Sequence, residues 1–218
     1  VFVRQMEWEA AQSVWCWRDG SASMDWRSSN KLPTKRERAE LLMLALMTLM
    51  VRAGEHVSLL GTGLAPGANR GTLVRLSEIL RREQPEDARD LPAPEPLPRH
   101  GQVLLFGDFL ADPTEIEHSL RGFAARGVKG HLVQVLDPAE ETLPYSGRVR
   151  FEGLQGERSW LLSRAEGVRA EYRHQLAAQT DAIQEIARRA GWRCTWHRTD
   201  RSPQTALLAV YSALAQHV

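Results

Sequence analysis

Short apolar runs alternate with longer amphipathic stretches along the 218-residue chain. Runs of four to eight apolar and β-branched residues are typical of buried strands, whereas apolar positions three or four residues apart indicate a helix with one buried face. We therefore expect strands at residues 13–17, 56–60, 103–106, 130–136 and 192–197, and helices at 35–52, 72–82, 113–125, 164–190 and 203–216. This alternation predicts an α/β fold, doubly wound, with a mainly parallel sheet and helices on both faces.

Residues at the predicted boundaries fit this assignment. Thr34 can cap the helix that starts at residue 35, and Gly54 can close it. Asp112 and Pro113 form the same kind of start for the helix at 113–125, since proline is well tolerated in the first turn. These signals fix two helix starts without any tertiary information.

The remaining segments extend this picture. Residues 148–151 and 158–162 resemble a small hairpin appended to the sheet, and residues 92–98 form a proline-rich connector that belongs on the surface. We expect the whole chain, 1–218, to form a single domain, because this length is ordinary for one. It begins without Met or a visible signal peptide, which suggests a fragment of a longer protein.

Composition narrows the classes of partner and the compartment. A net charge of +1 provides no global field to attract nucleic acid or anionic lipid. The most apolar run, residues 41–51, is too short to span a bilayer, so we expect a buried core helix there and no membrane span. Cys16 and Cys194 are the only cysteines in a chain too large to need disulfides. We therefore expect a reducing, cytoplasmic setting.

Candidate chemistry lies where the predicted strands end. Asp19, Ser21 and Ser23 follow the first strand and place one carboxylate and two hydroxyls within five residues, while Asp108 follows the strand at 103–106. Oxygen ligands with vacant positions suit Mg²⁺, which prefers octahedral oxygen coordination and retains several waters. Because ligands of such sheets bind outside the carboxyl ends of the strands, we expect these residues, with Thr72, to converge on one crevice.

The pattern Asp-x-Ser-x-Ser, with Thr72 and Asp108, resembles the metal-ion-dependent adhesion site of von Willebrand factor type A domains. More narrowly, residues 3–7 leading to 19–25 and then Lys35 resemble domain-of-unknown-function family 58, which is linked to MoxR-type AAA+ ATPases. Members of that family usually carry a further segment before this start.

The resemblance implies a non-catalytic module for protein–protein interaction. Its implied metal residues are Asp19, Ser21, Ser23, Thr72 and Asp108, which would hold Mg²⁺ or Mn²⁺. A partner protein would complete the metal shell with an Asp or Glu carboxylate, and the ion site can be empty until it does. A MoxR-type ATPase is the implied partner, acting in complex assembly or maturation.

Several alternatives remain open at this point. Asp-Gly-Ser is also an ordinary turn sequence, and Thr62 lies in another loop after a strand and can replace Thr72 at the site. A phosphate-handling hydrolase with an aspartate nucleophile also begins with such a loop, although Ser21 stands where its second Asp is usual. Gly61-Thr62-Gly63 only weakly favours dinucleotide binding, because Pro66 interrupts it. Trp26, just beyond the loop, is a candidate partner contact.

Overall fold

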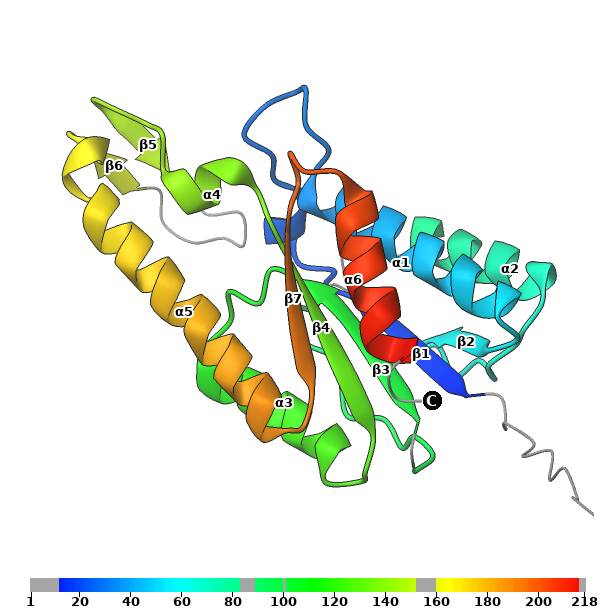
Figure 1. Ribbon diagram of the computed structural model, residues 1–218. Coiled ribbons are helices and arrows are strands. Elements are labelled where there is room, and N and C mark those ends of the chain that lie inside the picture. The colour runs from blue at the N-terminus through cyan, green and yellow to red at the C-terminus, as the bar shows by residue number, and fades with distance from the viewer. Residues whose placement is uncertain (1–11, 83–88, 100, 152–159, 216–218) are drawn as a thin grey trace, which may run out of the picture.

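The computed structural model describes residues 12–82, 89–99, 101–151 and 160–215. Its centre is a five-stranded sheet in which every neighbouring pair is parallel, in the order β2-β1-β3-β4-β7 (Figure 1). The strands are β1 (Ser13–Arg18), β2 (His56–Leu59), β3 (Gln102–Gly107), β4 (Lys129–Leu136) and β7 (Arg193–Arg198). The predicted α/β fold with a parallel sheet is confirmed.

Helices follow the strands as the pattern predicts. They are α1 (Lys35–Arg52), α2 (Arg70–Arg82), α3 (Pro113–Ala124), α4 (Pro138–Thr142), α5 (Arg169–Arg189) and α6 (Pro203–Ala215), with short 3-10 helices η1 (Ala22–Asp25) and η3 (Ala165–Gly167). Thr34 caps α1, accepting from the backbone N–H of Glu37 at 3.1 Å, and Asp112 caps α3 by accepting from Thr114 N. In the described part of the chain, no helix is both long and apolar enough to cross a bilayer.

The sheet separates two apolar layers (Figure 1). Helices α1, α2 and α6 cover one face and pack on side chains such as Cys16, Leu104 and Phe106. Helices α3 and α5 cover the other face, where Trp15 and Leu105 lie. Successive residues of one strand point to opposite faces, so a strand buried on both sides reads as a continuous apolar run.

The strand order places a topological switch point between β1 and β3. The chain leaves β1 toward β2 on one side and later returns to β3 on the other side of β1. The connecting helices α1 and α3 therefore lie on opposite faces and leave a crevice beyond the carboxyl ends of β1 and β3, the usual ligand position in such sheets. Asp19 and Asp108 follow these two strands.

The hairpin differs from the prediction in one respect. Strands β5 (Val149–Phe151) and β6 (Trp160–Leu162) pair antiparallel as predicted, but they form their own two-stranded sheet and are not appended to the main one. The segment between them contains the predicted turn at residues 153–156, which lies outside the described residues. The main sheet ends at β7, so its described strands are all parallel.

A buried histidine joins α1 to the end of the sheet. His197, on β7, is within 3.2 Å of Arg38 Nη1 through its Nε2, and Arg38 also donates to the carbonyls of Thr199 and Arg201. Burial and the neighbouring Arg38 lower the pKa of His197 from 6.5 to about 4, although Asp200 acts in the opposite direction. Neutral His197 accepts the Arg38 hydrogen bond, so the folded protein disfavours its protonation.

We expect this histidine to make the fold acid-sensitive. Between pH 6.5 and 4 the unfolded chain binds a proton at His197 that the native protein does not, so stability falls as the pH falls. In His197→Gln the amide oxygen can still accept from Arg38, and the loss of stability between pH 7 and pH 5 should be smaller. Urea denaturation at the two pH values measures this, with His118→Gln on α3 as the surface control. Equal losses in wild type and His197→Gln would contradict the assignment.

Candidate metal site

The loop after β1 meets the end of β3 at the carboxyl edge of the sheet. The backbone N–H of Asp19 donates to Phe106 O at 2.8 Å and so extends the β1–β3 pairing by one residue. Gly107 makes room for the Asp19 side chain, because a Cβ there would lie 3.0 Å from Asp19 Cβ and 3.2 Å from its Oδ2. The two segments are therefore in close contact before any side-chain hydrogen bond is considered.

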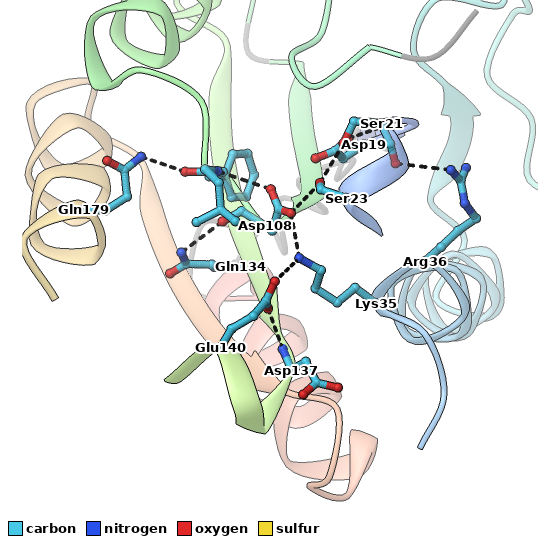
Figure 2. A network of polar contacts seen from close by, with 12 residues as sticks. Asp19, Ser21, Ser23, Lys35, Arg36, Asp108, Gln134, Asp137, Glu140 and Gln179 are labelled. Carbon is cyan, nitrogen blue, oxygen red and sulfur yellow. Dashed lines mark hydrogen bonds and ion pairs between the residues drawn. The ribbon is translucent and has the colours of Figure 1, made fainter. Parts of the chain in front are cut away.

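A chain of hydrogen bonds joins the predicted ligands (Figure 2). Asp19 Oδ1 accepts from the backbone N–H of Ser21 at 2.8 Å, and the hydroxyls of Ser21 and Ser23 are 2.9 Å apart. Ser23 Oγ then donates to Asp108 Oδ2 at 2.6 Å. The structure thus brings four of the five predicted residues together.

Arginines and a buried methionine hold the loop in place. Arg18 Nη1 donates to Asp19 O at 2.8 Å, and Arg36 Nη2 donates to the carbonyls of Gly20 and Ser21 at 3.0 and 3.3 Å. Met24, in η1, is fully buried in the core beneath α1. Because its carbonyls are bound and Met24 is anchored, the loop presents its serine hydroxyls from a fixed backbone.

A strained turn aims Asp108. Phe109, the next residue, has φ of 52°, a left-handed conformation that is uncommon for an aromatic residue. Two glutamine amides hold this turn: Gln134 Nε2 donates to Asp108 O at 3.0 Å, and Gln179 Nε2 donates to Phe109 O at 2.9 Å (Figure 2). Asp108 Oδ1 accepts from the backbone N–H of Leu110 at 3.2 Å. The orientation of this carboxylate is therefore imposed by β4 and α5.

Two charged residues at the site were not expected from the sequence. Lys35 is fully buried, and its Nζ lies 2.8 Å from Asp108 Oδ2 and 2.5 Å from Glu140 Oε1 (Figure 2). Glu140 belongs to α4, where Asp137 is the N-cap and Glu140 completes a capping box. The sequence Asp-Pro-Ala-Glu directly after β4 is a recognisable helix start, so this signal could have located α4 and Glu140.

Electrostatics set Asp19 apart from an ordinary turn residue. The side chain is 1% exposed, and its Oδ2 is enclosed without a hydrogen-bond partner. Burial and the nearby Asp108 raise the pKa of Asp19 from 3.8 to about 7, against the hydrogen bonds from Ser21, with a further small increase from Asp90. A turn aspartate is normally exposed or has both oxygens hydrogen-bonded, whereas Asp19 is buried and one of its oxygens has no hydrogen-bond partner among the described residues.

The pKa values of Lys35 and Glu140 are both shifted, each by its own surroundings. Burial disfavours the Lys35 ammonium, but Asp108 and Glu140 outweigh burial and raise its pKa. Burial also raises the pKa of Glu140, and Lys35 offsets this only in part. The Lys35 ammonium contacts two carboxylates, and the pair is therefore held in its charged form.

The donor set fits a small divalent cation. Asp19, Asp108, Ser21 and Ser23 provide only oxygen atoms, which Mg²⁺ and Mn²⁺ prefer. Asp19, Asp108 and the largely buried Glu140 place three carboxylates in this cluster, and the Lys35 ammonium contacts two of them, so a divalent ion would add positive charge where carboxylates gather. Among the described residues there is no cluster of three or more His, Cys, Asp and Glu side chains arranged for a metal, so any such site depends on the serine hydroxyls.

The structure places Thr72 elsewhere, which corrects the expected convergence. After β2 the chain turns back, and Gly67 pairs antiparallel with Val57 near the amino end of the sheet. Thr72 lies there in the first turn of α2. A Cβ on Gly67 would lie 2.4 Å from the Thr72 hydroxyl, and the Thr72 N–H donates to Asn69 Oδ1. Thr62 is at the carboxyl end instead, lining a cavity of about 610 Å³ with Gly20. Its hydroxyl donates to Leu59 O at 2.8 Å.

Trp26 lies at the end of η1, on the rim of the site. Its side chain is half-buried, and its carbonyl accepts from the backbone N–H of Lys35 at 3.4 Å. The indole is therefore partly available to solvent close to the loop. Its contact with a partner remains a prediction.

Comparison with known proteins assigns the family. The model of the family described as "Protein of unknown function DUF58" matches residues 1–182. A search of curated proteins found no match.

Among solved structures, an aerotolerance-related membrane protein from Bacteroides fragilis, with multiple mutations to serines, is similar with a TM-score of 0.58 and 14% identity, over 94% of this chain and 100% of that one. The conserved hypothetical protein BatB from Bacteroides thetaiotaomicron has a TM-score of 0.53 and 15% identity, over 94% and 98%. At these identities the likeness concerns the fold alone. The family match covers most of the chain, and the chain therefore belongs to the DUF58 family.

Proposed function

We propose that this chain is a non-catalytic protein-interaction module whose binding depends on Mg²⁺ or Mn²⁺ held by Asp19, Ser21, Ser23 and Asp108. The proposed partner is a MoxR-type AAA+ ATPase of the cytoplasm, which the chain would assist in complex assembly or maturation. The von Willebrand A-like fold of a DUF58 domain supports the coarser conclusion, a protein-interaction module. The metal and the partner are the steps that need testing.

One observation carries the metal assignment: Asp19 Oδ2 is buried without a partner beside an all-oxygen donor set. An unpaired buried carboxylate is costly, and native proteins retain such groups where a ligand compensates them. The position also suits an ion or water better than a bulky substrate, because the oxygen is enclosed by protein.

The positions of the four residues indicate different roles in binding the ion. Ser21 and Ser23 present hydroxyls that can contact an ion directly, while Asp19 and Asp108 balance its charge directly or through water. A bound Mg²⁺ supplies a vacant coordination position that a partner's Asp or Glu carboxylate can fill. A charge-assisted contact of this kind gives orientation and specificity.

The geometry gives less support to a phosphate-handling hydrolase. An aspartate nucleophile must reach the phosphorus of its substrate, whereas Asp19 Oδ1 accepts from Ser21 N and Oδ2 is enclosed. Lys35, a buried cation of the cluster, is bound to Asp108 and Glu140 and is not free to hold a phosphate. No second candidate is therefore advanced.

We expect the purified protein to be stabilised by Mg²⁺ or Mn²⁺ relative to EDTA. At an ion concentration ten times the dissociation constant the gain is about 1.4 kcal/mol, measured as a rise in melting temperature. Ser23→Ala should reduce this rise, because it removes one hydroxyl ligand. Ser77→Ala removes a serine hydroxyl on α2 that donates to Val74 O, and it should leave the rise unchanged. If millimolar Mg²⁺ gave the same melting temperature as EDTA, the metal assignment would be wrong.

The partner arm of the same experiment uses a MoxR-type ATPase from the source organism. We expect the two proteins to co-elute in Mg²⁺ and to separate in EDTA, and we expect Ser23→Ala to weaken the complex in Mg²⁺. Equal co-elution in Mg²⁺ and in EDTA would show that binding does not depend on the metal. Separation in every buffer would overturn the choice of partner.

A further inference from the structure

A buried ammonium already occupies one side of the acidic cluster. Lys35 has no exposed surface, and its Nζ contacts Asp108 at 2.8 Å and Glu140 at 2.5 Å. The oxygen that it contacts on Asp108, Oδ2, is also the acceptor for Ser23. Lys35 and the serine that we assign to the ion thus share a single carboxylate oxygen.

Fold stability does not explain why a lysine stands at this position. Lys35 opens α1, and its neighbours on the same helix, such as Ala39, Leu42 and Met43, are buried apolar residues. Removing an ammonium from water is expensive, and buried ion pairs can often be replaced by apolar residues without loss of stability. The positive charge of Lys35 therefore has its main effect on the neighbouring carboxylates of the cluster.

The charges of the cluster do not cancel. Asp19 and Asp108 are buried, and Glu140 is largely buried, with its side chain 13% exposed. Lys35 contacts Asp108 and Glu140, whereas Asp19 Oδ2 has no hydrogen-bond partner among the described residues. The Lys35 ammonium thus acts on the Asp108–Glu140 side of the cluster, and the unbonded carboxylate oxygen lies on the Asp19 side. An added cation can therefore bind on the Asp19 side. The positive charge of Lys35 reduces the attraction that the carboxylates exert on that cation.

We propose that Lys35 is a built-in counter-cation that sets the affinity of the site for divalent ions. This inference rests on the proposed ion-dependent function and specifies how that function is tuned. Lys35 keeps the affinity of the isolated chain low by neutralising Asp108 and competing for its Oδ2. The carboxylate of a partner then adds negative charge in place of the charge that Lys35 neutralises. The ion and the partner therefore bind together.

Titration calorimetry with Mg²⁺ and with Mn²⁺ tests this directly. Lys35→Met keeps the length of the side chain and removes its charge, and we expect on the order of tenfold tighter binding. Glu140→Gln keeps Lys35 and removes one negative charge, so we expect on the order of tenfold weaker binding. Lys31→Met removes the same charge from the exposed loop before α1 and should change the affinity far less.

The outcomes separate this inference from the proposed function. If the wild type binds Mg²⁺ and neither Lys35→Met nor Glu140→Gln changes the affinity, Lys35 is a structural residue and the inference fails alone. If only Lys35→Met binds, Lys35 takes the place of the ion in the wild type, so the inference stands and ion dependence fails. If none of the proteins binds, both fail. Should Lys35→Met fold only in the presence of Mg²⁺, by circular dichroism, that result supports the inference.

Discussion

We expect Asp19→Asn to be more stable than the wild type in EDTA and to have lost its response to Mg²⁺. The asparagine Oδ1 can still accept from Ser21 N, whereas the charge that burial and Asp108 disfavour is gone. The raised pKa of Asp19 corresponds to a gain of about 1 to 3 kcal/mol at pH 8, because each unit is worth about 1.4 kcal/mol and the protein relaxes around the charge. Urea denaturation in EDTA and in Mg²⁺ measures both effects.

The informative result is a change in the relative stability of Asp19→Asn and the wild type between EDTA and Mg²⁺. In EDTA the variant should unfold at higher urea than the wild type, and saturating Mg²⁺ should narrow or reverse the gap, because only the wild type gains from the ion. Asp181→Asn removes an exposed carboxylate from α5 and should leave the midpoint nearly unchanged in both buffers. A destabilised Asp19→Asn in EDTA would show that the carboxylate has a structural role.

The second large effect is expected at Gly130, on β4. A Cβ at this position would lie 2.1 Å from atoms of the Trp192 ring, which covers the bare backbone of Gly130. Trp192 cannot move freely, because its Nε1 donates to Val128 O at 3.0 Å and its ring packs near Phe123. We therefore expect Gly130→Ala to lose at least about 2 kcal/mol by chemical denaturation, as for other overpacked cores.

A second glycine provides the matched control. Gly122 lies inside α3, and a Cβ there would meet nothing within 4 Å. Gly122→Ala should stabilise the protein by about 0.5 to 1 kcal/mol, since alanine is the better helix former. The same substitution thus has opposite signs at two sites, and equal effects would show that the fit of Trp192 against β4 is looser than described.

Local sequence signals predict those parts of the structure that depend on neighbouring residues or on the fold class. Helix α1 runs from Lys35 to Arg52 as predicted, because Thr34 provides a cap that depends only on its immediate neighbours. Asp19 and Asp108 meet because the carboxyl ends of adjacent parallel strands share one edge, which follows from the fold class. These parts of the fold and site needed no knowledge of side-chain packing.

The remaining features depend on tertiary geometry. The resemblance and the order along the chain predict Thr72 at the site, but the direction of the loop after β2 is set by the pairing of Gly67 with Val57. Lys35 at the start of a helix is ordinarily an exposed residue, and only the packing of α1 against Asp108 and Glu140 shows its burial. The independent β5–β6 sheet was missed because antiparallel pairing does not reveal what a hairpin packs against.

The buried lysine has a consequence for the order in which the chain is made. Lys35 and Glu140 are separated by 105 positions, and Ser23 and Asp108 by 85. On the ribosome the ammonium therefore emerges long before either carboxylate that neutralises it. Asp108 follows Lys35 by 73 positions and Glu140 by 105, so the ammonium lacks its full set of carboxylates until α4 has been synthesised. The first turn of α1 should therefore remain hydrated and accessible to chaperones until α4 emerges.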